Sequence, residues 1–389
     1  MMTTLRSHIV GFTLVAALLS VCHIAAAAVS GDQCKAQETQ AVAINAYGRR
    51  LSIDDESTPF YQPTDSLASP RFSGVRTYAR LPHVTSMEGV DVAVFGIPFD
   101  TGASFKIGQR YGPESVRSAS HLLRPYNPDV NVTVFGALSC VDFGDVSVVP
   151  GYIQASYAAM EKDITELAEA GVVTLGFGGD HSVTLGELRA LAKVHGPMSL
   201  VHFDSHSDVW DSYFGKKYNH GTPFRRAVEE GLLLPSKSIQ IGMRGPLYSA
   251  TDRKDATDLG FNVLTTSDLA SLKPLVLGAA VRRIVGASPA FLSFDVDFFD
   301  PAYAPGTGTP EVGGPSTQVG LGYLRALRDI NWVGGDVVEV LPALDHGQIT
   351  AHAAAQVGFE FLSLVAARAE ALRTVRAECD ALRKDKEEL

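Results

Sequence analysis

The chain has 389 residues, 46% of them hydrophobic and 20% charged, a balance that is ordinary for a globular protein and excludes a disordered one. Its formal net charge of −10 is unfavourable for binding nucleic-acid phosphates, so we expect no nucleic-acid partner. The 4 cysteines are not a disulfide framework, and none has the spacing of metal ligands. An acidic chain of this length is better suited to a single large domain that binds a small cationic molecule.

Residues 1–28 have the pattern of a secretory signal peptide. Arg6 precedes an apolar core from Ile9 to Val21, and small residues around Ala28 suit cleavage. We therefore expect a secreted protein with no membrane segment after cleavage, since no later stretch looks long and apolar enough to span a bilayer. The alternative is a retained signal anchor, because the run from Ile9 to Val29 could just cross the membrane.

Secretion would allow covalent modification of three later residues. In an oxidising compartment Cys34 and Cys379, near opposite ends of the mature chain, could form a disulfide. Asn131 begins an Asn-Val-Thr sequence, which accepts an N-linked glycan if the host glycosylates secreted proteins. The sequence alone leaves both modifications open.

After the signal, residues 29–88 show little periodicity and predict an extended N-terminal arm, and residues 89–389 predict one domain that ends in a long C-terminal helix. Strand and helix patterns alternate through this domain. The expected strands cover residues 91–97, 139–143, 171–177, 198–204, 238–243, 261–265, 290–295 and 336–340. The clearest helical patterns between them cover residues 154–170, 182–195 and 316–330.

The strands are near-continuous apolar runs, which is typical of strands buried on both faces of a sheet. Regular alternation with helices predicts a three-layer αβα domain around a mostly parallel sheet of about eight strands. In such folds ligands bind at the carboxyl ends of the strands. Polar side chains that follow a strand are therefore candidates for a site.

Three of the predicted strands run directly into acidic and histidine residues. Side chains two positions apart on a strand share a face, so each cluster can direct its ligands to one point. The candidates are His181 after the first strand, Asp204, His206 and Asp208 after the second, and Asp295 and Asp297 after the third. Two imidazoles and four carboxylates are too many for one zinc ion but suit two adjacent divalent ions. Because no thiolate is present, the set favours Mn²⁺ over Zn²⁺.

Each cluster by itself would have a simpler explanation. An Asp after a strand often caps a turn or helix, and the pair in "DVD" alone would be a cap or a surface pair. We interpret Asp180 and Asp300 in that way, as turn residues or groups that support a ligand. His202 has the same parity as Asp204 but lies deeper in the strand, and we expect a hydrogen-bonded core residue there. The joint occurrence at three strand ends is what favours a metal site.

The motifs "FGGDHS", "HFDSHSDVW", "NHGTPFRRA", "SFDVDFFDPAYAPGTGTPE" and "DVVEVLPALDH" resemble, in order and spacing, those of the ureohydrolases, the family of arginase and agmatinase. The resemblance extends over roughly residues 85 to 370 and implies an arginase-like fold. It also implies a pair of Mn²⁺ ions whose bridging hydroxide attacks a guanidinium carbon, releasing urea and an amine. Homo-oligomers, usually trimers or hexamers, are common in this family.

Carried over position by position, the resemblance implies a role for each metal ligand. His181 and Asp208 would bind one manganese ion, and His206 and Asp297 the other. Asp204 and Asp295 would bridge the two ions.

Three residues would then carry out the chemistry. Asp208 would also hydrogen-bond the hydroxide and pass its proton to the leaving nitrogen. His220, in "NHG", resembles the family's proton shuttle, and Glu339, in "VVEV", matches the carboxylate that pairs with the guanidinium. Without the metal cluster we would place His220 in an ordinary loop and Glu339 at a strand end.

The identity of the guanidine depends on the far end of the substrate. The loop after Asp208 lacks the hydroxyl cluster of arginases, and the later motifs resemble the agmatinase branch, which favours agmatine. The alternative is 4-guanidinobutanoate or 3-guanidinopropanoate, whose carboxylate would need a cation. Residues 96–117 contain Asp100, Lys106 and Arg110 and so permit either substrate. An inactive metal-binding protein is a remote alternative, because all the expected positions are filled.

Overall fold

The computed structural model describes residues 58–387. The predicted signal peptide, most of the predicted N-terminal arm and Cys34 lie outside the described residues, so those predictions stay predictions. Cys379 is disulfide-bonded and Cys140 is a buried free cysteine. Asn131 lies exposed in the short turn between β2 and β3, with φ of 61°.

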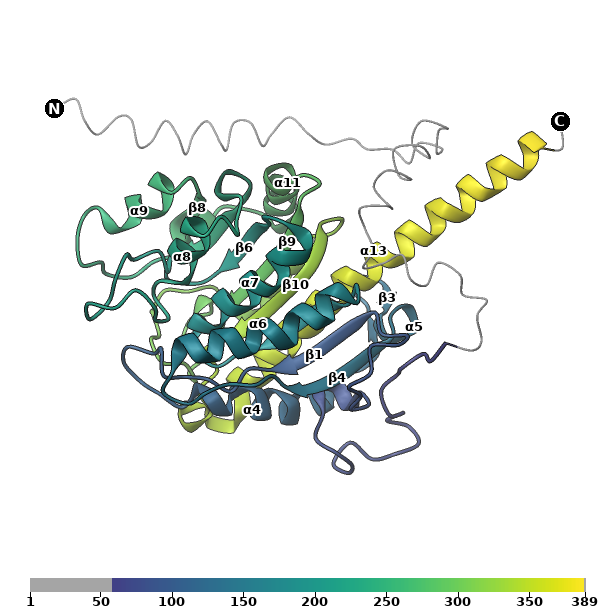
Figure 1. Ribbon diagram of the computed structural model, residues 1–389, viewed down its shortest axis with the longest axis horizontal. Coiled ribbons are helices and arrows are strands. Elements are labelled where there is room, and N and C mark those ends of the chain that lie inside the picture. The colour runs from purple at the N-terminus through teal and green to yellow at the C-terminus, as the bar shows by residue number, and fades with distance from the viewer. Residues whose placement is uncertain (1–57, 388–389) are drawn as a thin grey trace.

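A parallel sheet of 8 strands forms the centre of the described chain, in the order β4-β1-β5-β10-β9-β6-β7-β8 (Figure 1). Its strands are β1 (Val92–Gly96), β4 (Cys140–Asp145), β5 (Val173–Phe177), β6 (Ser199–Phe203), β7 (Ile239–Met243), β8 (Asn262–Thr265), β9 (Pro289–Asp295) and β10 (Asn331–Val338). A small antiparallel pair, β2 (Tyr126–Asn127) and β3 (Val132–Thr133), lies apart from it. The predicted fold class is confirmed.

Helices cover both faces of this sheet. One face carries α6 (Ile153–Glu169), α7 (Thr184–His195) and α8 (Pro223–Glu229), and the other carries α4 (Gly112–Ala119), α11 (Pro274–Val285), α12 (Thr317–Arg325) and α13 (Ile349–Glu387). The described part of the chain also contains the short helices α5 (Val134–Ala137), α9 (Asp252–Asp258) and α10 (Thr266–Leu269). Each layer of helices has its own apolar core against the sheet, as continuous apolar strands require.

The last strand is longer than its sequence pattern indicated. Glycines weaken a strand pattern, and the pair at Gly334 and Gly335 hid the first half of β10. A Cβ at Gly334 would lie 2.4 Å from Thr174 Oγ1 and 2.8 Å from Leu191 Cδ1, so the close packing of β5 and α7 requires glycine there. The strand also ends at Val338, two residues before the end of the expected strand 336–340, which leaves Glu339 outside the ladder.

Helix α13 corrects a second expectation. By length and composition alone, the stretch His346–Arg383 could cross a membrane, although we expected no such segment after the signal. However, 78% of its apolar window is buried inside the protein, where α13 packs against β10, α4 and α12. Core helices of this kind are apolar because they are covered by other elements. Only the far end of α13 extends beyond the domain (Figure 1).

Residues 58–88 contain no α-helix or strand but pack closely on the domain. Tyr78 is fully buried, stacks near Phe177 with ring centroids 4.8 Å apart, and donates a hydrogen bond to the carbonyl of Ala355. Its backbone N–H donates to Asp142, in strand β4. This segment therefore connects the sheet edge to the C-terminal helix.

Candidate metal and guanidine site

The candidate site lies at the carboxyl ends of four neighbouring strands, β5, β10, β9 and β6. Strand order changes direction between β5 and β6, which are consecutive in the chain but separated in the sheet by β10 and β9. Such a switch point is where parallel sheets form ligand sites, because the loops that follow the strands diverge there. The structure brings together all the residues that the motifs indicated: His181, Asp204, His206, Asp208, His220, Asp295, Asp297 and Glu339.

His181 faces three carboxylates. Its Nδ1 lies 3.1 Å from Asp204 Oδ2, 3.0 Å from Asp208 Oδ2 and 3.3 Å from Asp295 Oδ2. The ring is buried at the start of a short 3-10 helix whose N-terminus is capped by the side chain of Asp180. Three carboxylate oxygens that converge on one nitrogen form a site for a single positive charge. We call this cluster of His181, Asp204, Asp208 and Asp295 the first nest.

The other nitrogen of His181 is occupied. The Ser293 hydroxyl donates to Asp336 Oδ1 at 2.7 Å, so its oxygen accepts a hydrogen bond from His181 Nε2–H at 2.9 Å. A proton held on Nε2 leaves a lone pair on Nδ1, directed at the three carboxylates. This is the tautomer that a metal ligand requires, and support by a hydroxyl–carboxylate chain is common for such ligands.

A second nest lies on the other side of Asp204. His206 Nδ1 is 3.4 Å from Asp204 Oδ1 and 3.1 Å from Asp297 Oδ2. His181 approaches one oxygen of Asp204 and His206 approaches the other. Asp204 therefore lies between two imidazoles, as a carboxylate shared by two cations would.

Two buried atoms of these nests have no hydrogen-bond partner, His181 Nδ1 and Asp297 Oδ2. Buried polar atoms normally have partners, because leaving one unpaired costs roughly 1–3 kcal/mol. In the metal-free chain a proton takes the place of a cation: burial lowers the pKa of His181, but the adjoining carboxylates of Asp204, Asp208 and Asp295 raise it well above its usual range. The donor set therefore fits divalent cations.

Glu339 and His220 form a separate pair beside the nests. His220 Nδ1 lies 2.9 Å from Glu339 Oε1, which also accepts the backbone N–H of His181 at 2.9 Å. Burial alone would lower the pKa of His220, but the hydrogen bond to Glu339 and its charge raise it to about 9. Burial alone would raise the pKa of Glu339. The hydrogen bond with His220 has the opposite and larger effect, so the pKa of Glu339 is lowered. At neutral pH the two form an ion pair.

Two of these acids occupy an unusual backbone conformation. Asp208 has φ of 51° and Glu339 has φ of 68°, in the left-handed region that residues other than glycine rarely adopt. Such strain costs about 1–3 kcal/mol per residue and is concentrated at functional sites. We had expected Glu339 within a strand; it instead lies in the turn that follows, where the positive φ lets its N–H donate to the carbonyl of Gly179.

A cavity of about 510 Å³ opens onto these residues. Its floor is lined by His206, Asp208, His220 and Asp295. Its mouth is lined by Phe105, Lys106 and Tyr248 on exposed loops, by the half-buried Tyr213 and by the exposed Arg253 at the start of α9. The volume is that of a site for a small molecule.

The charged residues of the 96–117 loop differ in whether a ligand in the cavity can reach them. Asp100 is only 1% exposed and is engaged by the Arg110 guanidinium, with its second oxygen accepting the N–H of Gly108. It is therefore not open to a ligand. Lys106, by contrast, lines the mouth of the cavity, and its Nζ lies 5.6 Å from the ring centroid of Phe105.

Sequence reasoning missed several supporting residues. The Ser104 hydroxyl is hydrogen-bonded to His220 Nε2 at 2.6 Å, and the Gln109 amide donates a hydrogen bond to Glu339 Oε2 at 2.8 Å. Arg244, after β7, donates to the carbonyls of Asp297 and Phe298 at 2.6 and 3.0 Å and so fixes the turn that carries Asp297. Nothing in the local sequence of these residues signals a site, because each acts through a partner distant in the chain.

The sequence and fold match known proteins over most of the domain. The family model described as "Arginase family" matches residues 90–363. The chain belongs to the arginase family. It is 43% identical over 306 residues to guanidinopropionase from Pseudomonas aeruginosa, covering 78% of this chain and 96% of that protein. It is also 42% identical over 294 residues to a mitochondrial agmatinase from Gallus gallus, covering 75% and 86%.

Among solved structures, the arginase-family chain resembles proclavaminate amidino hydrolase from Streptomyces clavuligerus. The TM-score is 0.74 at 39% identity, over 77% of this chain and 100% of that one. An arginase from Bacillus subtilis has a TM-score of 0.60 at 26% identity, over 70% and 98%. These relatives differ in the substrates that their names indicate, so similarity of this degree leaves the substrate open.

Proposed function

We propose that this arginase-family hydrolase binds two Mn²⁺ ions and cleaves the guanidinium group of a small guanidino compound to urea and an amine. The observation that carries the proposal is the position of His181 Nδ1, a buried atom without a hydrogen-bond partner that lies 3.0 to 3.3 Å from three carboxylate oxygens. His181 and Asp208 would hold one ion, and His206 and Asp297 the other. Asp204 and Asp295 would be shared between them.

Manganese suits this donor set better than zinc does. The six side chains supply four carboxylates and two imidazoles with no thiolate, and the total exceeds the four donors of a typical zinc site. When bound, a pair of divalent ions supplies an acidified water as nucleophile and positive charge near the reacting carbon.

The protein's own residues would orient the guanidinium and manage its protons. A carboxylate can accept two N–H groups of a planar guanidinium at once, and Glu339 lies beside the nests in position to do so. Because Glu339 Oε1 is held by His220, a bound guanidinium would compete with that ion pair. His220, released but still protonated, could then donate a proton to the leaving amine. Asp208 would accept the proton from the nucleophile, as its place in the first nest allows.

For the far end of the substrate, the contacts favour a guanidino acid over agmatine. Asp100, the acid that could have paired with the ammonium of agmatine, is already engaged by Arg110. Two other acids line the cavity wall: Asp252 accepts hydrogen bonds from Ser249 and from the N–H of Tyr248, and Glu311 Oε1 lies 3.9 Å from His206 Nε2. Among the described residues, no contact occupies the charged groups of Lys106 and Arg253 at the mouth apart from the ring of Phe105. We therefore propose a guanidino acid such as 3-guanidinopropanoate or 4-guanidinobutanoate, with agmatine second.

Urea release from a panel of guanidines tests the proposal. The mature chain is loaded with Mn²⁺ and given 3-guanidinopropanoate, 4-guanidinobutanoate, agmatine and arginine at matched concentrations. We expect urea from at least one guanidino acid, with a higher kcat/KM than from agmatine. Absence of urea from every compound would refute the enzymatic proposal, whereas a preference for agmatine would refute only the choice of substrate.

A further inference from the structure

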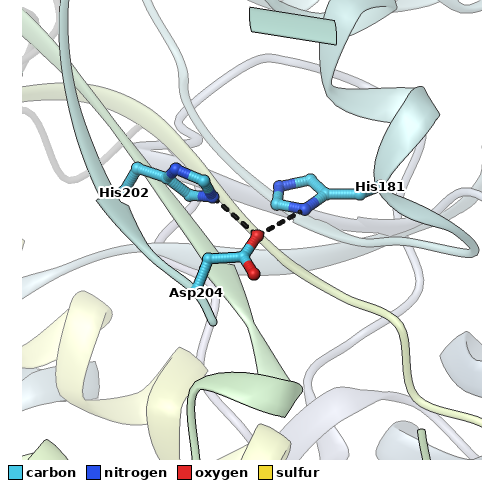
Figure 2. Close-up of side chains that lie close together, drawn as sticks. All are labelled: His181, His202 and Asp204. Carbon is cyan, nitrogen blue, oxygen red and sulfur yellow. Dashed lines mark hydrogen bonds and ion pairs between the residues drawn. The ribbon is translucent and has the colours of Figure 1, made fainter. Parts of the chain in front are cut away.

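His202 lies within the metal nest but was not expected there. It stands in β6, fully buried, with Nε2 2.8 Å from Asp204 Oδ2 (Figure 2). His181, His202 and Asp204 together have the spacing of a set of metal ligands. The ring could therefore be a ligand, an inert core residue or a support for Asp204, and its hydrogen bonds decide among the three.

The protons on the His202 ring follow from a neighbouring amide. Gln240, in β7, places its Nε2 2.7 Å from the carbonyl of Ser207 and 3.1 Å from His202 Nδ1. A carbonyl only accepts hydrogen bonds, so this atom is the amide nitrogen, and its second hydrogen points to Nδ1. Nδ1 is thus an acceptor, and the proton of the neutral ring is on Nε2.

His202 Nε2–H therefore donates to Asp204 Oδ2, and the other oxygen, Oδ1, accepts the N–H of His206 at 2.6 Å. Each carboxylate oxygen has two lone pairs, so each keeps one free. His181 Nδ1 lies on the Oδ2 side and His206 Nδ1 on the Oδ1 side. The two donors orient Asp204 so that its free lone pairs face one imidazole each.

Ring packing fixes the plane in which His202 donates. Phe224, in α8, packs against His202 with ring centroids 4.4 Å apart and against His181 at 5.3 Å with perpendicular planes. The two imidazoles meet edge to face at 5.2 Å. One phenyl ring thus holds both imidazoles, so that His202 cannot rotate away from Asp204 without displacing a candidate ligand.

We infer that His202 is a positioning residue for the shared carboxylate Asp204, locked in its donor tautomer by Gln240, and that it is not a metal ligand. With Nδ1 accepting and Nε2 donating, the ring has no lone pair left for an ion. The inference rests on the proposed metal pair. It predicts that His202 controls manganese binding without touching manganese.

Two substitutions at this position separate the roles. His202→Leu removes the donor at similar volume, whereas the amide nitrogen of His202→Gln can reach near the place of Nε2 and restore a donor. Metal-free full-length variants are titrated with Mn²⁺ by calorimetry, and the spectrum of the coupled ion pair is followed by electron paramagnetic resonance. We expect His202→Leu to weaken manganese binding about 10- to 100-fold, the usual cost of losing a ligand's hydrogen-bond partner, and His202→Gln to recover most of it.

Two further variants complete the test. Gln240→Leu frees the ring to take either tautomer and should produce a smaller loss of affinity in the same direction. Val201→Ala, a truncation at a fully buried neighbour in β6, should lower the melting temperature but leave manganese affinity unchanged. This control separates loss of stability from loss of positioning.

The outcomes distinguish this inference from the proposed function. Two manganese ions in the wild type with unchanged affinity in His202→Leu would overturn the inference and leave the proposed function standing. A His202→Gln variant that binds one ion fewer than the wild type would also overturn it, because that result would make His202 a ligand. A wild-type chain that binds no manganese would overturn the proposed function, and the inference with it.

Discussion

The floor and the mouth of the cavity are built in different ways. The floor residues are buried or half-buried, with Asp295 3% and His220 9% exposed, whereas at the mouth Phe105 is 71% and Tyr248 75% exposed. Hydrogen bonds or close charged contacts hold the floor groups, while Lys106 extends from a loop and Arg253 from the start of α9. The difference suggests that the floor residues carry out the reaction and that the mouth residues select the substrate. Substitutions in the two regions should therefore have different kinds of effect.

The largest effect is expected for Asp297→Ala at the base of the second nest. The variant loses the carboxylate 3.1 Å from His206 Nδ1, and the chain should then hold fewer manganese ions. Losing a partner of a ligand already costs about 10- to 100-fold in affinity or activity, so losing the ligand itself should cost more than 100-fold. Metal content by elemental analysis and the rate of urea release measure the two consequences.

Asp252→Ala is the matched control for that variant. It removes the same side chain from the wall of the same cavity, but from a carboxylate whose hydrogen bonds are with Tyr248 and Ser249. We expect it to keep its manganese. Equal metal loss in both variants would contradict the distinction between floor and mouth.

The next largest effect is expected for Glu339→Gln. A hydrogen bond to a charged group contributes about 1.5–3 kcal/mol, so replacing the carboxylate should lower kcat/KM by about 10- to 100-fold. The neutral amide should also let the pKa of His220 fall from about 9 toward its usual value of 6.5. Titration of the His220 ring by nuclear magnetic resonance in the metal-free protein measures this shift, and a midpoint unaffected by the substitution would contradict the ion pair.

The same pair makes a signed prediction for stability. The pKa of His220 is raised by folding, so the free energy that its protonation contributes to stability is fully present below about pH 6.5. It is lost as the pH rises through about 9. The difference in melting temperature between wild type and Glu339→Gln, both metal-free, should therefore narrow between pH 7 and pH 10; a constant difference would contradict this linkage.

The contrast between floor and mouth also explains what the sequence could predict. The spacing of Asp204, His206 and Asp208 after an apolar run predicted that they would meet, but the reason was only partly right: β6 ends at Phe203 and Asp208 has a φ of 51°, so the alternation of a strand does not extend through them. The meeting of His181 with Asp295 was expected because the carboxyl ends of parallel strands lie at one edge of the sheet, but the order of the strands was not predicted. Glu339 was identified by its motif, but its left-handed backbone was not, because that conformation accompanies a hydrogen bond to the carbonyl of Gly179, in the distant loop after β5.

The mouth was much less predictable. Asp100 and Lys106 are six residues apart in one loop, and the sequence allowed either to face the substrate. Only the fold shows that Asp100 turns inward to Arg110 while Lys106 lines the cavity. Pairings of this kind depend on loop conformations that local propensity does not encode.

A moderate effect is expected for charge reversal at the mouth. Lys106→Glu and Arg253→Glu should each lower kcat/KM for a guanidino acid and raise it for agmatine. Exposed ion pairs contribute about 0.2–1 kcal/mol, which corresponds to roughly 1.4- to fivefold per residue. Both variants should keep two manganese ions, and added salt should reduce the discrimination. Equal changes for acid and amine substrates would contradict a role for these cations in selecting charge.

The smallest effect is expected for Tyr248→Phe, which tests whether the mouth needs any fixed hydrogen bond. The Tyr248 hydroxyl lies 2.8 Å from that of Tyr213, and Trp210 packs against both rings, with centroids 5.4 Å and 5.1 Å away. Because both hydroxyls can bond to water, losing one should cost less than about 1 kcal/mol and change kcat/KM less than fivefold. Tyr248→Ala, which also removes the ring, should have the larger effect and act mainly on KM. If Tyr248→Phe instead lowered kcat as much as Glu339→Gln does, the mouth would take part in the reaction itself, and the division between the two regions would have to be abandoned.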